Sequence, residues 1–153
     1  MKIGIGADHG GFEMKEELKK RLADDGYEVT DKGCYSLEEV DYPDVAADMV
    51  AGIGACEYEC GILICGTGIG MSIAANKGAG IRAALITDVY SARMAKAHNN
   101  ANIVTLGART IGVELAYELV KAYLKEEFLG GKHQGRVTKI QELEKNKIGY
   151  NWE

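Results

Sequence analysis

Hydrophobic and polar positions follow two alternating patterns along this chain. Short apolar runs predict strands over residues 3–7, 27–30, 62–65, 83–86 and 103–106. Apolar positions spaced three or four apart predict helices over 12–24, about 42–53, a stretch after residue 70, 89 to about 98, 113–129 and about 137–145. Regular alternation of this kind indicates an α/β fold with parallel strands and helices on both faces, a Rossmann-like three-layer α/β/α sandwich.

Turn and capping residues stand where this pattern requires them. Gly26 follows the first helix as a stop signal, and Asp41 and Pro43 supply an N-cap candidate and an early-turn proline for the second. There is neither a linker nor a low-complexity stretch between the elements. We therefore expect residues 1–153 to form a single domain.

The most distinctive segment follows the third expected strand. Its apolar run ends in Cys65, and glycines stand at alternate positions, Gly66, Gly68 and Gly70. A strand, a glycine turn and a helix start would present unpaired N–H groups and the positive end of the helix dipole, which together attract an anion. The same field stabilises a thiolate, so Cys65 is a candidate base or nucleophile. The alternative is a turn that only lets the helix pack closely, with Cys65 as a small buried residue.

Three familiar phosphate motifs almost match this turn. A P-loop would end in Gly-Lys-Ser/Thr, which is missing here and disfavours ATP hydrolysis. A dinucleotide fingerprint would need a third glycine at position 71, and a cysteine phosphatase loop would need an arginine there. The chain has Met71 instead. What remains is an anion-binding turn without the parts specific for nucleotides.

Polar residues also follow the other expected strands, where ligands bind in parallel sheets. Asp8 and His9 follow the first strand, Arg109 follows the last, and His98 ends the helix after the fourth. We expect this polar chemistry to collect at one rim of the sheet. The alternatives are a solvated turn for the first pair, a helix C-cap for His98 and a solvated surface for Arg109.

A basic cluster near the C-terminus contrasts with the acidic chain around it. Lys132, His133 and Arg136 stand within five residues, whereas the net charge is −5. Such a cluster is usually solvated surface, but beside an anion-binding turn it could clamp a phosphate.

Composition excludes several classes of protein. Of the 153 residues, 46% are hydrophobic and 27% charged, which is typical of a globular protein. There is no long basic run, which disfavours nucleic acid as a partner, and no apolar stretch of the roughly 20 residues that cross a membrane. The chain enters its first strand at once, so we expect no leader peptide.

The cysteines indicate a reducing compartment. Four cysteines are too few for a disulfide scaffold of this size. Cys56 and Cys60 lie near Cys65, but histidines with matching spacing are lacking, which disfavours zinc. We therefore expect a cytoplasmic protein without a metal.

Together, seven motifs resemble those of the ribose-5-phosphate isomerase type B family, which also includes allose-6-phosphate isomerases and galactose-6-phosphate isomerase subunits. The resemblance runs nearly end to end. It rests on Asp8-His9-Gly10-Gly11, Asp41-Tyr42-Pro43-Asp44, Gly61-Ile62-Leu63-Ile64-Cys65-Gly66-Thr67-Gly68-Ile69-Gly70, Ala74-Ala75-Asn76-Lys77, Gly80-Ile81-Arg82-Ala83, His98-Asn99-Asn100-Ala101-Asn102 and Gly130-Gly131-Lys132-His133-Gln134-Gly135-Arg136.

The resemblance implies a fold, an assembly and a reaction. It implies five parallel strands in the order 2-1-3-5-4 and a homodimer, sometimes paired into a tetramer, with active sites shared between subunits. A C-terminal helix over about 132–147 would pack on the partner. The reaction would interconvert ribose 5-phosphate and ribulose 5-phosphate through an enediolate, without metal or organic cofactor.

The resemblance also implies roles for particular residues. Cys65 would be the base that moves a proton between C2 and C1, and the N–H groups of residues 66–70 would stabilise the enediolate oxygen. His98, helped by Thr67 and Asp8, would open the furanose ring.

The remaining residues would bind the substrate. His9, Arg109 and Arg136 would hold the phosphate. Tyr42 and Asn99 would line the sugar.

Two positions depart from the pattern of some family members. Lys132 stands where many members have arginine, so that a bidentate phosphate contact becomes a point charge. Met71 stands where one branch has a glutamate base, and this chain retains Cys65. The resemblance therefore implies the branch with a thiol base.

Two other functions remain open at this point. One is a six-carbon phosphosugar isomerase, acting on allose 6-phosphate or galactose 6-phosphate. The other is a regulatory module that binds a sugar phosphate without turning it over. Such a module would need no base at Cys65.

Overall fold

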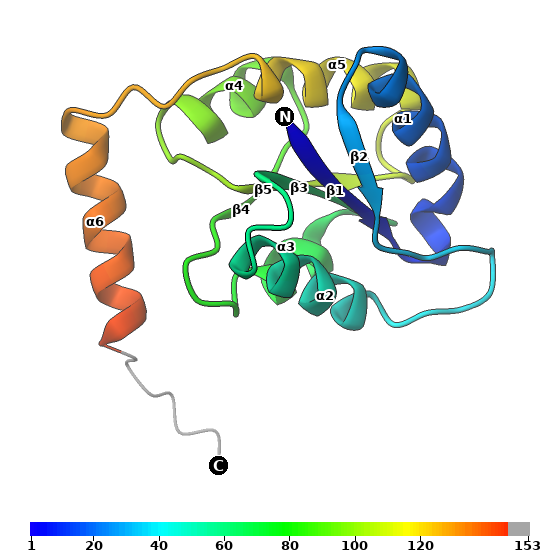
Figure 1. The fold of residues 1–153 in the computed structure, drawn as a ribbon, viewed down its shortest axis with the longest axis horizontal. Coiled ribbons are helices and arrows are strands. Elements are labelled where there is room, and N and C mark those ends of the chain that lie inside the picture. Colours follow the sequence, from blue (N-terminus) through cyan, green and yellow to red (C-terminus); the bar gives the residue numbers. More distant parts are fainter. Residues whose placement is uncertain (147–153) are drawn as a thin grey trace.

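The computed structural model describes residues 1–146 and has the expected alternation of strands and helices (Figure 1). The strands are β1 (Lys2–Ala7), β2 (Glu28–Asp31), β3 (Cys60–Cys65), β4 (Ala83–Leu85) and β5 (Ile103–Gly107). The helices are α1 (Phe12–Asp24), α2 (Tyr42–Gly54), α3 (Ile69–Ala75), α4 (Val89–Ala97), α5 (Val113–Leu124) and α6 (Lys132–Lys145). A short 3₁₀ turn, η1 (His9–Gly11), precedes α1.

The five strands form one parallel sheet in the order β2-β1-β3-β5-β4, which confirms the expected strand order. Helices α1, α4 and α5 cover one face, and α2 and α3 cover the other (Figure 1). The three-layer α/β/α sandwich is therefore confirmed.

The central strand β3 is buried on both sides, and its side chains alternate between the two helix layers. Ile62 and Ile64 join the core under α1, α4 and α5. Leu63 and Cys65 join the core under α2 and α3. The thiol of Cys65 is thereby directed to the side of the sheet where α3 begins.

Helix α5 ends earlier than the apolar pattern predicts, at Leu124 instead of residue 129. The polar residues from Lys125 onward interrupt its apolar face, and the chain turns back toward α4. There the N–H of Leu129 donates to the carbonyl of Ala97 at 3.0 Å. The prediction of a helix over 113–129 is wrong for its last turn.

Helix α6 begins earlier than the pattern over 137–145 predicts. Gly130 and Gly131 both have positive φ angles, 61° and 54°, and this bend allows a helix to start directly at Lys132. The start of the expected 132–147 helix is thus correct, and residue 147 lies outside the described residues.

At the start of α2, Asp41 occupies the N-cap position but its side chain makes no capping hydrogen bond.

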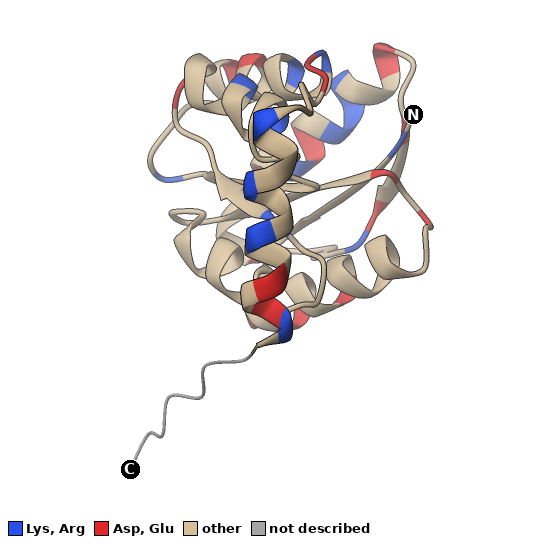
Figure 2. Cartoon of the chain, turned by 90° about the vertical axis from the view of Figure 1, so that its left-hand side faces the viewer, with Lys and Arg blue, Asp and Glu red and all other residues tan. Residues whose placement is uncertain are grey.

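Helix α6 stands apart from the sandwich as an arm (Figure 1). Its buried residues are His133 and Val137, whereas Ile140 and Leu143 are exposed. Figure 2 shows basic residues along its first turns and acidic residues toward its end. Within residues 1–146, none of the helices is long and apolar enough to cross a membrane.

Candidate active site

The turn after β3 is built around the thiol of Cys65. The side chain is 5% exposed, and its Sγ atom accepts a hydrogen bond from the N–H of Gly68 at 3.1 Å. Gly68 has φ +77°, and a methyl group there would lie 2.9 Å from the carbonyl carbon of Leu106. Both the conformation and the space therefore require glycine at this position.

The neighbouring strand β5 fixes the same turn. Thr105 donates from Oγ1 to the carbonyl of Gly68 at 2.9 Å, and this contact is buried. The N–H groups of Ala108 and Arg109 donate to the carbonyls of Cys65 and Gly66 at 2.8 and 2.9 Å. The turn is thus held by hydrogen bonds from β5 and the loop that follows it.

Asp8 lies beside this turn, in the loop after β1. Its Oδ1 atom accepts from the N–H of Gly11 at 3.0 Å, and its own N–H donates to Ile64 at the end of β3. A methyl group on Gly11 would lie 2.7 Å from the Ile64 carbonyl oxygen, so the two loops are in close contact. Asp8 is buried, with 9% of the residue exposed.

Arg109 reaches the same place from the loop after β5. A methyl group on Gly10 would lie 3.3 Å from Asp8 Oδ1, 3.6 Å from Arg109 Nη2 and 3.7 Å from the Gly66 nitrogen. A carboxylate, a guanidinium and a backbone N–H therefore surround one small space left by glycine.

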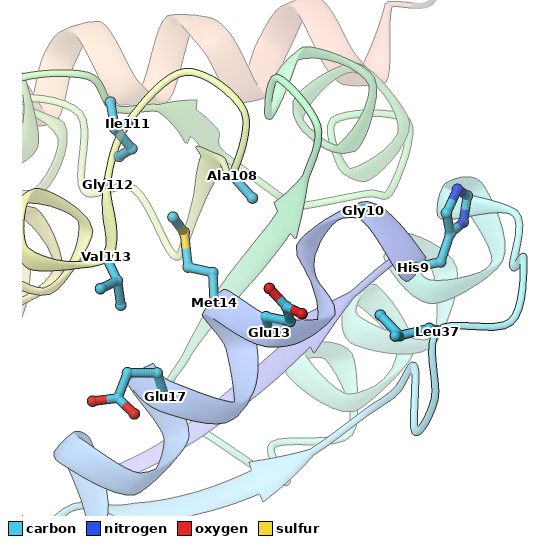
Figure 3. A pocket seen from close by; sticks show the side chains of 10 residues that line it. All are labelled: His9, Gly10, Glu13, Met14, Glu17, Leu37, Ala108, Ile111, Gly112 and Val113. Atoms are coloured by element: carbon cyan, nitrogen blue, oxygen red, sulfur yellow. The ribbon is translucent and has the colours of Figure 1, made fainter.

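His9 lies next to this space, at the rim of a cleft of about 500 Å³ between the start of α1 and the loop 108–113 (Figure 3). Its Nδ1 atom accepts a hydrogen bond from the N–H of Val40 at 3.4 Å. In the neutral ring this leaves the proton on Nε2, which can donate to an anion.

Tyr42 and Thr67 flank the turn from the α2 and α3 side. The Tyr42 ring lies over Gly70, where a methyl group would come within 2.8 Å of the ring carbons. The Oγ1 atom of Thr67 accepts from the N–H of Ile69 at 3.3 Å, which caps the first turn of α3. Both hydroxyl groups therefore belong to the same side of the site as Cys65.

His98 belongs to a second group of residues. It follows the last turn of α4, and its imidazole stacks on that of His133 in α6, with ring centroids 4.1 Å apart and planes 7° from parallel. The next two carbonyls, of Asn99 and Asn100, accept hydrogen bonds from Nε of Arg82 at 3.1 and 2.9 Å. Lys132 and Arg136 lie on the same first turns of α6 as His133.

The two groups lie at opposite edges of the sheet. Helix α4 starts after the carboxyl end of β4 and runs back over the sheet for nine residues, about 13 Å. The segment after it reaches the amino ends of the strands, where Asn102 accepts from Gly61 of β3 and donates toward the start of β4. The expectation that His98 shares a rim with Cys65 is therefore wrong within one chain, because a crossover helix returns to the opposite edge.

The structure thus brings some of the expected site residues together and separates others. One group gathers at the carboxyl edge: Asp8, His9, Tyr42, Cys65, Gly66, Thr67, Gly68, Gly70 and Arg109. The other group gathers around the end of α4 and the start of α6: His98, Asn99, Lys132 and Arg136.

Two residues that contact the second group, His133 and Arg82, have no individual role among the residues expected at the site. Burial lowers the pKa of His133, and the charges of His98, Lys132 and Arg136 lower it further. Arg82 belongs to the Gly80-Ile81-Arg82-Ala83 motif, for which the resemblance gives no role. The available signal for His133 was its place inside the Lys132–Arg136 cluster.

Among residues 1–146, no three His, Cys, Asp or Glu side chains are arranged to hold a metal ion. The groups gathered at the carboxyl edge are a thiol, a carboxylate, an imidazole, a guanidinium and backbone N–H donors.

Comparisons with known proteins identify the family of this chain. The profile of the family described as Ribose/Galactose Isomerase matches residues 3–140. Ribose-5-phosphate isomerase B of Escherichia coli is 45% identical over 146 residues, which cover 95% of this chain and 98% of that protein. D-erythrulose-4-phosphate isomerase of Pectobacterium atrosepticum is also 45% identical, over 92% of this chain and 93% of that protein.

A solved structure matches over almost the same length. The ribose-5-phosphate isomerase B of Clostridium thermocellum superposes with a TM-score of 0.94 at 52% identity and covers 95% of this chain and 99% of that one. Sequence and structure agree over nearly all of the chain, so it belongs to the ribose/galactose isomerase family.

Proposed function

We propose that this protein is an aldose–ketose isomerase that interconverts D-ribose 5-phosphate and D-ribulose 5-phosphate. The observation that carries the proposal is the Cys65 thiol held by the N–H of Gly68 beside a space bounded by Arg109 and Asp8. Relatives named for this reaction, at 45% and 52% identity, support it.

The residues of the carboxyl edge suit proton transfer between C2 and C1. The Cys65 thiolate removes the proton from C2 of the open-chain aldose and returns it to C1, while the hydroxyl proton on O2 moves to O1. N–H groups of residues 66–70 stabilise the negative oxygen of the enediolate between these steps. A fixed donor such as the Gly68 N–H stabilises the thiolate before the reaction and needs no reorganisation during it.

The phosphate lies at the other end of the substrate in this proposal. His9 and Arg109 hold it from one subunit, and Lys132 and Arg136 hold it from the other. Binding energy at this remote group helps to orient the reacting carbons.

We propose further that the protein is a homodimer whose active sites combine Cys65 of one chain with His98 and Asn99 of the other. The separation of the two residue groups within one chain supports this arrangement. So does the α6 arm, which buries little of its surface against its own chain.

An exposed apolar surface also supports a dimer. Ile69 and Ile73 are 51% and 58% exposed and lie one turn apart on α3, next to the turn 65–70 that holds the thiol (the thiol turn). Val89 and Tyr90 at the start of α4 are also exposed. Exposed apolar side chains on neighbouring turns of one helix, such as Ile69 and Ile73, suit an interface.

A base that works as a thiolate has to stay reduced, and the four cysteines of the chain are free thiols. We therefore propose that the enzyme works in the cytoplasm, where thiols are kept reduced. The reaction as written moves protons and needs neither a metal nor a redox cofactor.

The test is an assay of purified protein, treated with EDTA, on ribose 5-phosphate, allose 6-phosphate, galactose 6-phosphate and erythrose 4-phosphate. We expect the largest kcat/KM for ribose 5-phosphate and no change after EDTA. A larger value for a six-carbon substrate would reassign the substrate. Binding of ribose 5-phosphate without any turnover would favour a regulatory module.

A further inference from the structure

The stacked pair His98–His133 joins two parts of the chain that are proposed to do different work. His98 ends α4 and is proposed to open the sugar ring. His133 lies in the first turn of α6, between Lys132 and Arg136, which are proposed to bind the phosphate. The rings are parallel within 7° at a centroid distance of 4.1 Å, so one ring stacks on the other.

The backbone on both sides of this contact is well held. Arg82 donates to the carbonyls of Asn99 and Asn100 and fixes the end of α4. The N–H of Leu129 donates to Ala97 at 3.0 Å, so the segment before α6 is joined to the same end of α4. These hydrogen bonds place the Cα atom of His98, but they do not set the plane of its ring.

The plane of an imidazole is weakly determined by its own bonds, because the terminal torsion of histidine joins an sp³ and an sp² carbon and is broad. A parallel ring in contact with one face restricts that rotation. The His133 side chain is buried, with 7% of the residue exposed, and its ring can restrict the rotation of the His98 imidazole. Burial and the nearby charges of His98, Lys132 and Arg136 lower the pKa of His133, which favours the neutral ring beside His98.

We infer that His133 is a positioning residue for His98 that sets the imidazole plane needed to open the furanose ring. The inference rests on the proposed function. Ring opening removes the proton from the C1 hydroxyl, breaks the bond between C1 and the ring oxygen O4, forms the C1 carbonyl and leaves a proton on O4. An imidazole in another plane directs its nitrogens away from the C1 hydroxyl and from O4 and cannot exchange protons with them. The later proton transfer at Cys65 does not involve His98.

The inference predicts a dependence on the form of the substrate. Ribose 5-phosphate exists mainly as a furanose, which must be opened. In erythrose 4-phosphate, O4 carries the phosphate, so a furanose cannot form and the opening step is bypassed. Loss of a positioning residue for His98 should therefore affect the first substrate and spare the second.

The variants are His133→Ala, which removes the stacked ring, and His133→Phe, which keeps a flat ring of similar size. Val137→Ala is the matched control, since Val137 is the other buried residue of α6 and its side chain carries no ring. We expect His133→Ala to lower kcat/KM on ribose 5-phosphate by about 10- to 100-fold, the scale of a small misplacement of a reacting group. On erythrose 4-phosphate the change should stay within about twofold, and His133→Phe should restore most of the loss.

A double-mutant cycle shows whether His133 acts through His98. If it does, His98→Asn combined with His133→Ala is no slower on ribose 5-phosphate than His98→Asn alone. Independent losses that multiply would overturn the inference. So would equal losses on both substrates, or a Val137→Ala variant with the same selective loss as His133→Ala.

If the wild-type enzyme does not turn over erythrose 4-phosphate, a binding measurement replaces the kinetic comparison. Binding of 5-phospho-D-ribonate, an open-chain acid with the same phosphate, is then measured by calorimetry. An unchanged Kd in His133→Ala supports the inference, and a Kd that rises as far as kcat/KM falls contradicts it. Failure of the proposed function is distinct, since wild-type protein would then be inactive on ribose 5-phosphate.

Discussion

The thiol turn at the carboxyl edge and the stacked histidines at the opposite edge are held by different means. The turn is bound to β5 by hydrogen bonds from Thr105, Ala108 and Arg109, and its glycines leave space that side chains would fill. The histidine pair is held by the ring contact and by α6, which buries two side chains and accepts a hydrogen bond at Glu144 Oε1 from the N–H of Gly80 at 2.6 Å.

This difference indicates how the two chemical steps are supported. Fixed backbone donors are effective for stabilising charge that develops in a transition state, because they need no reorganisation. The turn can offer them in every single chain. Each chain also contains its own stacked pair of His98 and His133. In the dimer that we propose, this pair lies beside the turn 65–70 of the other chain. Substitutions at the two edges should therefore have different signatures.

The largest expected effect is at the thiol. Cys65→Ala should lower kcat by at least about 10²–10⁴-fold, because it removes the proposed base, while phosphosugar binding stays intact. Steady-state kinetics and calorimetry on ribose 5-phosphate measure the two effects. Cys65→Ser, which lacks the acidity, should be almost as slow. Activity of Cys65→Ala within a few-fold of wild type would remove Cys65 from the mechanism.

Gly68→Ala should have the next largest effect. This variant tests whether the position of the Gly68 N–H contributes to catalysis. A methyl group would approach Leu106 to 2.9 Å in a backbone conformation with φ +77°, so the turn has to shift. Displacing a donor of this kind costs about 10²–10³-fold in kcat. Thermal unfolding should show some loss of stability too. A variant with normal kcat would mean that the Gly68 N–H does not contribute to catalysis.

Much of the fold follows from local patterns in the sequence. The apolar runs locate all five strands to within a residue or two, and the glycines after Cys65 indicate the turn, because φ +77° at Gly68 requires glycine. The strand order came from the family resemblance. The end of α5 was missed because the contact of Leu129 with Ala97 is a tertiary interaction that the apolar pattern does not contain.

The site was harder to predict than the fold. Residues directly after a strand, such as Asp8 and Arg109, lie where the strand-end argument puts them. His98 does not, because it follows a helix that runs antiparallel to the strands and returns to the other edge. The stacking of His133 on His98 joins positions 35 apart in sequence, and neither position carries a local signal for it.

The arm should show a smaller and more selective effect. Arg136→Ala should lower kcat/KM on ribose 5-phosphate by about 10- to 100-fold, in line with roughly 1.5–3 kcal/mol for a charge-assisted contact. Use of unphosphorylated ribose should not change. The comparison is made with both sugars under identical conditions. Equal losses on the two would assign Arg136 a structural role in the arm.

The smallest expected effect is at Lys132. Lys132→Arg should be tolerated and should lower the KM for ribose 5-phosphate by no more than a few-fold, because a guanidinium can bind a phosphate through two hydrogen bonds. The measurement is KM at two salt concentrations, since a point charge is screened more than a bidentate contact. A clear rise in KM would show that the arm requires the shape of lysine at this position.

The central claim is that the two edges meet between subunits, and mixing two inactive variants tests it most directly. Cys65→Ala and His98→Asn proteins are unfolded and refolded together in equal amounts, so that about half of the dimers contain one chain of each kind. Each mixed dimer then has one doubly altered site and one intact site. We expect about a quarter of wild-type activity for independent sites. If native mass spectrometry shows mixed dimers and activity does not return, Cys65 and His98 do not form a shared site.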